Sequence, residues 1–353
     1  MTKYNIATIP GDGIGNEVIS VGQKILEKVA SLFEFEINWT NYNWSCETYK
    51  KTGQMMPKDG IKQISDSDAI YLGAVGFPGV PDHISLWGLL IPIRREFEQY
   101  VNLRPVRLFE GVPCPLVGQK PGSIDFLVVR ENCEGEYSNI GGIENKGTEE
   151  EKVTQLSVFT KKGTDRILKY AFELAKKRSK KHLTSATKSN GIMHTMPYWD
   201  SRVREIAKKY QNINVDQYHI DILTANFVLK PQIFDVVVGS NLFGDILSDL
   251  GPAVTGTIGI APSANLNPEL DFPSMFEPVH GSAPDISGRG ISNPIGAIWA
   301  GAMMLQHLGE PEAYKLILSA IEKTLKHKKF LTRDMGGVSS TTELGDEILK
   351  KLG

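Results

Sequence analysis

Two consecutive segments indicate the fold most clearly: Phe234-Asp235-Val236-Val237-Val238-Gly239 and Leu242-Phe243-Gly244-Asp245-Ile246-Leu247-Ser248-Asp249. The first is a short apolar run, which is typical of a buried strand, and the second has the spacing of a helix. A buried strand that leads directly into a helix is the repeating unit of α/β proteins.

Strand-like and helix-like stretches alternate on both sides of this segment. Further strands are expected at residues 5–10, 69–75, 125–130, 155–160, 182–186 and 215–220, and helices at 18–29, 87–100, 163–181, 295–308 and 312–326. This alternation predicts an α/β architecture with a largely buried sheet. The polar stretch 144–152 is expected to be a surface turn. No linker divides the chain, so two domains would be interleaved.

Composition excludes several classes of protein. The 353 residues carry 39 Lys+Arg against 41 Asp+Glu, a net charge of −2. This balance argues against a nucleic-acid binder with a basic face and against an acidic disordered chain. The longest mostly apolar stretch, 295–308, is too short to cross a bilayer, and residues 1–10 lack the apolar core of a signal peptide.

The three cysteines, Cys46, Cys114 and Cys133, are an odd number and form no CxxC pair. A disulfide framework is therefore not expected, and the cysteines favour a reducing compartment. Together with the missing signal peptide, this predicts a cytoplasmic protein with no membrane partner.

A glycine-rich turn, Gly11-Asp12-Gly13-Ile14-Gly15-Asn16, joins the first expected strand to the first helix. It nearly fits the dinucleotide-binding fingerprint, but Asn16 stands where the third glycine belongs. No acidic residue ends a second strand at the usual distance. We interpret the segment as a tight strand-to-helix turn.

Three arginines, Arg94, Arg104 and Arg130, lie near the ends of expected elements. A guanidinium binds a carboxylate through two parallel hydrogen bonds, so three of them suit a small dicarboxylic acid. The alternative is surface ion pairing, such as Arg95 with Glu98.

Asp245 and Asp249 are spaced i and i+4, so a helix places both carboxylates on one face. A divalent cation would remove their repulsion, and ligands made only of oxygen suit Mg²⁺ or Mn²⁺. Asp221, after the strand 215–220, is a candidate third ligand. The alternative is that the acidic pair complements the start of a helix.

The loop Glu277-Pro278-Val279-His280-Gly281-Ser282-Ala283-Pro284-Asp285 is dense in turn residues and hydrogen-bonding groups. An Asp there can accept both ribose hydroxyls of an adenosine, whereas a 2′-phosphate would require Lys or Arg. The alternative is a turn whose polar groups satisfy one another. Tyr137 and Lys188 carry no signal by themselves.

In this order, the segments resemble the metal-dependent β-decarboxylating dehydrogenases of 2-hydroxy acids, the isocitrate/isopropylmalate dehydrogenase family. The resemblance runs from Ile9 to Gly345. Its most specific parts are Asn102-Leu103-Arg104-Pro105, Arg130-Glu131-Asn132 with Tyr137, the stretch 241–249, and 277–285 with Asn293-Pro294.

The resemblance implies an isopropylmalate dehydrogenase-like two-domain fold that is not a Rossmann fold. Residues 1–100 and 250–353 would form a discontinuous large, cofactor-binding domain. Residues 101–249 would form a small central domain with a dimerisation arm. The chain would be a homodimer with shared active sites, in which Lys188 and Asp221 reach the partner's site.

The resemblance also implies a role for each candidate residue. Tyr137 and Lys188 would be the acid–base pair, and Asp285 followed by Ile286 looks like the NAD form of the family. A requirement for a monovalent cation such as K⁺ stays open. The remaining residues would bind ligands. The substrate carboxylates would be bound by Arg94, Arg104 and Arg130, and Mn²⁺ or Mg²⁺ by Asp221, Asp245 and Asp249. The adenosine half of NAD would be bound by His280, Gly281, Ser282, Ala283, Asp285 and Asn293.

The stretch 82–93, before Arg94, indicates the substrate. Leu86-Trp87 replaces the Pro-Glu pair of isopropylmalate enzymes, and Ile91 and Ile93 stand where isocitrate enzymes place small polar residues. The string looks most like the D-malate/tartrate branch, with Trp87 either filling the space of a larger substituent or merely packing its helix.

The expected reaction is NAD-dependent oxidative decarboxylation of D-malate to pyruvate and CO₂, with tartrate oxidation as a further activity. The alternatives are 3-isopropylmalate dehydrogenase, an inactive regulatory subunit, and a metal-dependent keto-acid decarboxylase without a redox step.

Overall fold

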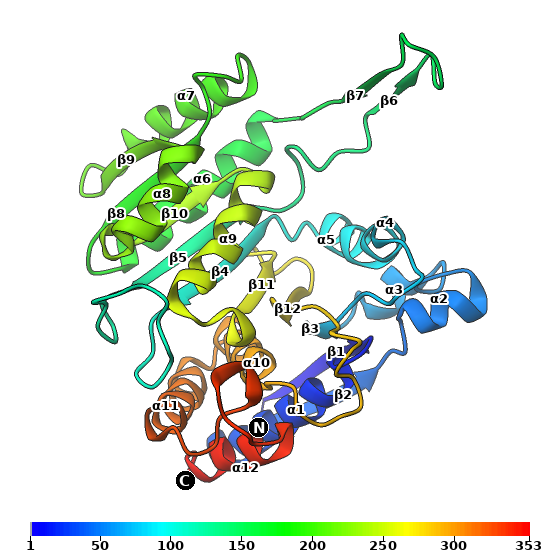
Figure 1. Cartoon of the computed structure of the whole chain (residues 1–353), viewed down its shortest axis with the longest axis vertical. Helices are drawn as coiled ribbons and strands as arrows, with labels where there is room; N and C mark the ends of the chain where they lie inside the picture. Colours follow the sequence, from blue (N-terminus) through cyan, green and yellow to red (C-terminus); the bar gives the residue numbers. More distant parts are fainter. Residues whose placement is uncertain (1) are drawn as a thin grey trace.

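A ten-stranded mixed sheet runs through the molecule (Figure 1) in the order β2-β1-β3-β12-β11-β4-β5-β10-β8-β9. The structure, a computed structural model, describes residues 2–353. A separate antiparallel pair, β6 and β7, projects from the body as a hairpin. The strands are β1 (Lys3–Gly11), β2 (Glu36–Asn41), β3 (Ala69–Ala74), β4 (Val101–Arg107), β5 (Asp125–Glu131), β6 (Gly141–Glu144), β7 (Lys152–Gln155), β8 (His182–Thr187), β9 (Asn214–His219), β10 (Val236–Gly239), β11 (Pro262–Leu266) and β12 (Ser274–Pro278).

Helices cover both faces of the sheet. In residues 2–353, no helix is long and apolar enough to span a membrane. The α-helices are α1 (Gly15–Phe33), α2 (Cys46–Thr52), α3 (Gly60–Ile64), α4 (Asp82–Ser85), α5 (Ile91–Glu96), α6 (Lys161–Lys177), α7 (Thr195–Ala207), α8 (Ile220–Leu229), α9 (Asn241–Thr255), α10 (Ile295–His307), α11 (Pro311–His327) and α12 (Thr341–Lys350). A π-helical turn, η1 (Leu86–Leu90), joins α4 to α5, and the 3₁₀ turns are η2 (Pro231–Ile233), η3 (Ile258–Ile260) and η4 (Arg333–Met335).

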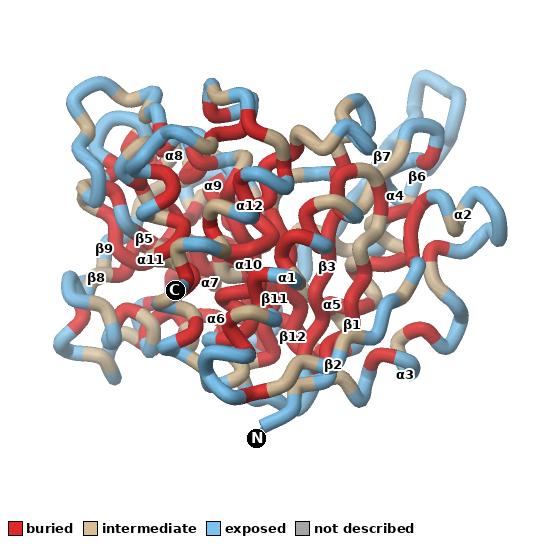
Figure 2. The backbone as a smooth tube through the Cα atoms, turned by 90° about the horizontal axis from the view of Figure 1, so that it is seen from below, coloured by how far each residue is buried: buried red, intermediate tan, exposed pale blue. Residues whose placement is uncertain are grey.

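The alternation of side chains along the strands divides the core into two layers. Ile6 and Tyr71 belong to the larger cluster, which includes the inner faces of α1 and α10. Ala7 and Leu72, one position along the same two strands, belong to a smaller cluster on the opposite face. Successive side chains of a strand point to opposite faces, so the buried middle of β1 and the whole of β3 contribute side chains to both clusters. The buried backbone is continuous through this region (Figure 2).

The sheet is not a Rossmann sheet, as expected. The β12–β11, β11–β4 and β4–β5 pairs are antiparallel, whereas β10 runs parallel to β5 and β8. Strands from residues 1–100 and 250–353 fill one half of the sheet and strands from 101–249 the other, with the β11–β4 pair between them. Residue 249 lies inside α9. The division into two domains stays a prediction.

Most expected strands and helices are confirmed, and three expectations need correction. The strand expected at 155–160 is wrong, because β7 ends at Gln155 and only Val158 pairs further, in a single bridge to Gly135. The helix expected at 87–100 begins at Asp82 and ends at Glu96, since the amide of Gln99 returns to the carbonyl of Arg94. The helix expected at 163–181 ends at Lys177, where the backbone becomes extended.

The polar stretch 144–152 forms the turn of the β6–β7 hairpin, as expected.

Candidate active site

Three buried arginines approach one region from three different elements. Arg94 lies on α5, Arg104 on β4 and Arg130 on β5, and their exposed fractions are 8%, 8% and 2%. In the antiparallel β4–β5 pair, Asn102 lies opposite Arg130, so Arg104 is two residues along the same face. Such burial is incompatible with surface ion pairs.

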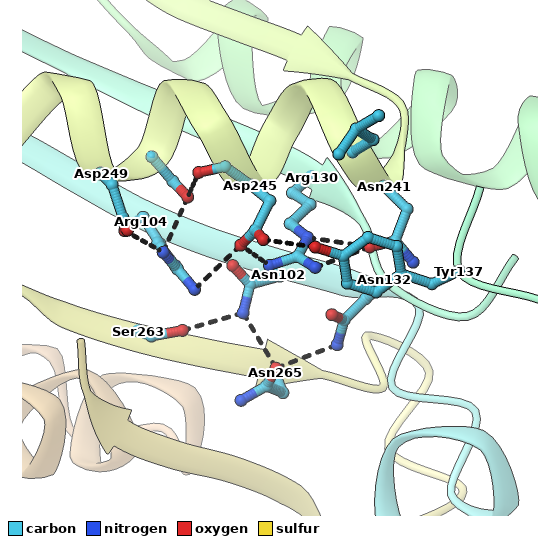
Figure 3. Close-up of polar contacts among 12 residues, drawn as sticks. Asn102, Arg104, Arg130, Asn132, Tyr137, Asn241, Asp245, Asp249, Ser263 and Asn265 are labelled. Atoms are coloured by element: carbon cyan, nitrogen blue, oxygen red, sulfur yellow. Dashed lines mark hydrogen bonds and ion pairs between the residues drawn. The ribbon is translucent and has the colours of Figure 1, made fainter. Parts of the chain in front are cut away.

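Helix α9 brings its acidic residues onto two of these arginines, Arg104 and Arg130 (Figure 3). The Asp245 carboxylate contacts the Arg130 guanidinium directly, and Asp249 Oδ1 lies 2.9 Å from Arg104 Nη1. The close approach depends on Gly244, because a Cβ there would stand 2.5 Å from the Arg130 Cβ. Asp245 and Asp249 therefore share one helix face, as their spacing predicts.

Tyr137 follows β5 and reaches the same carboxylate. Its hydroxyl donates to Asp245 Oδ2 at 2.7 Å, and the Arg130 Cζ lies 5.3 Å from the centre of its ring. Burial, together with the hydrogen bond to Asp245, raises the pKa of Tyr137. A raised pKa keeps the hydroxyl protonated at neutral pH, as a proton donor requires.

Lys188 and Asp221 stand apart from this cluster and pair with each other. Lys188 Nζ lies 2.9 Å from Asp221 Oδ1, and this hydrogen bond lowers the pKa of Asp221. In the described part of the chain, residues 2–353, no three His, Cys, Asp or Glu side chains gather as a metal site. One chain therefore does not unite Asp221 with Asp245 and Asp249, and the expectation that Asp221 serves the partner's site stays a prediction.

The residues present fit a divalent cation and a diacid. Asp245 and Asp249 offer only carboxylate oxygens, which Mg²⁺ and Mn²⁺ prefer. Within the described residues, the Nε atoms of Arg94 and Arg104 are buried and have no hydrogen-bond partner. Unpaired buried donors are costly, so these two point to an anionic ligand that accepts from them.

The expected cofactor loop follows β12 and lies against the glycine-rich turn. The Ile14 amide donates to the Ser282 carbonyl at 2.9 Å, and a Cβ on Gly13 would stand 2.0 Å from that oxygen. Gly13 also has φ +56°. The turn is thus a tight strand-to-helix turn whose glycine allows backbone to pack on backbone. Asp285 is exposed on the loop. The His280 ring, in contrast, is half-buried, and this burial lowers the pKa of His280.

Asn293 fixes the start of α10. Its Oδ1 accepts from the Ile295 amide at 3.0 Å, and its Nδ2 donates to Asp334 Oδ2, also at 3.0 Å. Asp334 was not foreseen from the sequence, since it lies 41 residues away in an unremarkable 3₁₀ turn.

Asp12 is a second residue that sequence reasoning missed. It is 0% exposed, and its carboxylate accepts from the backbone amides of Cys46 at 3.0 Å and Gly76 at 3.1 Å. It therefore ties the glycine-rich turn to the segments that follow β2 and β3. Its position between two glycines of the near-fingerprint was the available signal.

A buried amide network connects to Arg94 through Glu277. Asn265 Oδ1 accepts from the Nδ2 atoms of both Asn102 and Asn132, each at 2.9 Å. Asn265 Nδ2 donates at 2.7 Å to Glu277, which also pairs with Arg94 at 3.0 Å. The network joins β4, β11 and β12, and no local pattern in the sequence reveals it.

Buried arginines, paired carboxylates and a tyrosine hydroxyl, assembled on a mixed α/β sheet, can bind a small acid and exchange a proton with it. The family model described as isocitrate/isopropylmalate dehydrogenase matches residues 5–348. The chain is 61% identical to D-malate dehydrogenase [decarboxylating] of Escherichia coli (strain K12), over 99% of both sequences. It is 58% identical to tartrate dehydrogenase/decarboxylase of Pseudomonas putida, over 98% of this chain and 97% of that one.

Solved structures of the same family also match this chain. Isocitrate dehydrogenase from Methylococcus capsulatus matches with a TM-score of 0.88 and 32% identity, over 100% of this chain and 99% of that chain. A β-decarboxylating dehydrogenase from Thermococcus kodakarensis matches with a TM-score of 0.80 and 34% identity, over 99% and 96%. The chain belongs to the isocitrate/isopropylmalate dehydrogenase family, and it is a decarboxylating dehydrogenase.

Proposed function

We propose that this chain oxidises and decarboxylates D-malate to pyruvate and CO₂ with NAD as the oxidant, and that tartrate is a second substrate. The observation that supports the proposal most is the hydrogen bond from the Tyr137 hydroxyl to Asp245, beside the guanidinium groups of Arg104 and Arg130. The similarity to D-malate and tartrate dehydrogenases supports the substrate class.

The arginines would bind the two carboxylates of the diacid. Arg104 and Arg94 each keep a buried Nε without a partner among the described residues, so each can donate one more hydrogen bond to an anion. Arg130 pairs with Asp245. Three guanidinium groups for two carboxylates would favour a compact diacid.

The chain's own residues would move the protons. Lys188 would accept the proton of the C2 hydroxyl while C2 passes its hydride to NAD, and Tyr137 would protonate the enolate carbon that remains when CO₂ departs. When bound, Mn²⁺ or Mg²⁺ would supply polarisation of the C2 oxygen. The sum is D-malate and NAD⁺ giving pyruvate, CO₂ and NADH.

The loop after β12 would select NAD over NADP. Asp285 is exposed on that loop and offers two acceptor oxygens, which suit ribose hydroxyls. The same negative charge would repel a 2′-phosphate. His280, Gly281, Ser282, Ala283 and Asn293 would complete the adenosine site.

A homodimer would complete each active site. Helices α8 and α9 contact one another, and α8 exposes Ile222 (48%) next to Asp221, while α9 exposes Ile246 (46%) next to Asp245. Exposed apolar residues on neighbouring helices favour an interface. A second copy seated there by twofold symmetry would bring Lys188 and Asp221 toward the partner's Asp245.

The β6–β7 hairpin would be the dimerisation arm. It extends away from the body and exposes Ile143 (51%) and Val153 (66%). An isolated two-stranded hairpin is marginally stable in water, so it is expected to pack against another surface. The three free cysteines suit the cytoplasm, where we place the enzyme.

A substrate panel tests the proposal. With NAD and Mn²⁺, we expect the highest kcat/KM for D-malate, followed by tartrate, and lower values for isopropylmalate and isocitrate. A preference of more than tenfold for isopropylmalate would reassign the branch. Turnover of D-malate without NAD would favour a decarboxylase without a redox step, and no turnover of any substrate would favour a regulatory subunit.

A further inference from the structure

The proposed reaction leaves one arginine of α5 without a role. Successive side chains of a helix point about 100° apart. Arg94 turns inward to Glu277, whereas Arg95 donates from Nη2 to the backbone carbonyl of Tyr137 at 2.8 Å. This six-residue helix thus delivers one guanidinium to the substrate region and the next to the segment that carries the tyrosine.

Trp87 holds Arg95 in place. The Arg95 Cζ lies 5.0 Å from the centre of the Trp87 ring, within the range of a cation–π interaction. Trp87 lies in the π-helical turn η1, a rare conformation that occurs frequently at functional sites. The same side chain lines a cavity of about 580 Å³ shared with residues of α2 and the segment before α3, among them Tyr49 and Met56.

Tyr137 is fixed at three points. Asp245 accepts from its hydroxyl, Arg130 lies over its ring, and Arg95 binds its backbone carbonyl. The first two groups are the ones that would meet metal and substrate during the reaction. The Arg95 contact lies on the backbone, so it remains available when Asp245 and Arg130 change partners.

We propose that Trp87 and Arg95 are positioning residues that hold Tyr137 for proton delivery, an inference that rests on the proposed function. Neither residue needs to touch the substrate. Removing either should leave substrate binding in place and slow the step that follows hydride transfer, because a displacement of about 1 Å can cost about 10²-fold in rate. Trp87 then contributes through Arg95 rather than by filling space beside the substrate.

The test compares Arg95→Met with the wild-type enzyme on D-malate, NAD and Mn²⁺. We expect kcat to fall by about 10- to 100-fold, the KM for D-malate to change less than about threefold, and NADH in the first turnover to form at the wild-type rate, giving a burst. Trp87→Leu should act in the same direction, and Trp87→Phe, which keeps an aromatic face, should restore most activity. Arg107→Met is the matched control, since Arg107 stacks on Phe109 at 5.2 Å and pairs with Glu322 rather than with Tyr137.

Each other outcome would overturn the proposal. An unchanged kcat would remove the positioning role, a loss confined to KM would assign Arg95 to substrate binding, and a first turnover slowed as much as kcat would separate it from Tyr137. Unfolding of Arg95→Met at the assay temperature would show a structural role. A wild-type enzyme inactive on D-malate and tartrate would instead refute the proposed function, and the role of Arg95 with it.

Discussion

Asp245 accepts from Tyr137 and Arg130 simultaneously, which makes it the residue on which most of the site converges. Its two oxygens are therefore shared between a hydroxyl donor and a guanidinium, and in the proposed site they would also bind the metal. The Asp245 side chain is 34% exposed, whereas the Arg130 side chain is 3% exposed, so a substitution at Asp245 must keep an oxygen that accepts from Arg130.

We expect Asp245→Asn to lose metal-dependent turnover, with kcat lower by about 10³-fold or more, because an amide is a weak ligand for a hard cation. Steady-state rates across a Mn²⁺ titration measure the loss, and thermal melting checks that the fold is kept. Asp216→Asn is the control, as Asp216 pairs with His182 on β8 and β9. Wild-type activity in Asp245→Asn would refute the metal assignment.

Tyr137→Phe should slow protonation of the enolate by about 10²- to 10⁴-fold while hydride transfer continues. Stopped-flow NADH formation and pyruvate release measure the two steps separately. Tyr42→Phe, which removes a hydroxyl that donates to Gln63, is the control. Equal losses in both steps would contradict the acid role.

The same tyrosine predicts a pH dependence. A proton donor is lost as the pH rises through its pKa, and the pKa of Tyr137 is raised by burial and by Asp245. The alkaline limb of kcat that belongs to this group should therefore lie above about pH 10. Its disappearance in Tyr137→Phe would identify it, and a tyrosine-dependent limb near neutrality would contradict the raised pKa.

At the scale of the element, strand β5 ends in a buried carboxylic acid, Glu131, whose burial costs free energy when the group is ionised. Glu131 is 1% exposed, and the amides of Cys133 and Glu134 donate to one of its oxygens at 2.7 and 3.0 Å. Its other oxygen has no partner among the described residues. Burial raises the pKa of Glu131 to about 7.

A raised pKa means that the folded state holds the proton more tightly than the unfolded state. The resulting stability is present at acidic pH and is lost as pH rises from about 4.5 to about 7, by at most about 3 kcal/mol. Glu131→Gln keeps an oxygen for both amides and should therefore raise the unfolding free energy at pH 8, with little difference at pH 4. Denaturant unfolding at both pH values measures this, with exposed Glu149→Gln as control. A difference independent of pH would contradict it.

At the scale of the whole molecule, the proposed shared sites predict that two inactive chains complement each other. Lys188→Met and Asp245→Asn should each be inactive as pure dimers. After mixing and refolding, half of the dimers are hybrids with one intact site, so about a quarter of the wild-type activity should return.

The control for this experiment places both substitutions on the same chain. Refolding that double variant alone should restore no activity. In its hybrid with a wild-type chain, each shared site contains one substituted residue, so this mixture measures the dilution of wild-type chains without complementation. No recovery in the first mixture, with hybrids verified by native mass spectrometry, would show that each chain carries a complete site.

Periodicity and residue type were enough to predict the alternating elements, the shared face of Asp245 and Asp249, and the three arginines as a group, because these depend on local spacing. They failed at 155–160, where β-branched residues sit in an exposed segment with a single bridge. Long-range contacts are invisible to such patterns. Tertiary structure alone decided four features: the β11–β4 pairing, the amide network around Asn265, the hydrogen bonds of Asp12 to the Cys46 and Gly76 amides, and the contact of Arg95 with Tyr137. Each joins residues that are far apart in the chain, and only the assembled sheet brings them within hydrogen-bond distance.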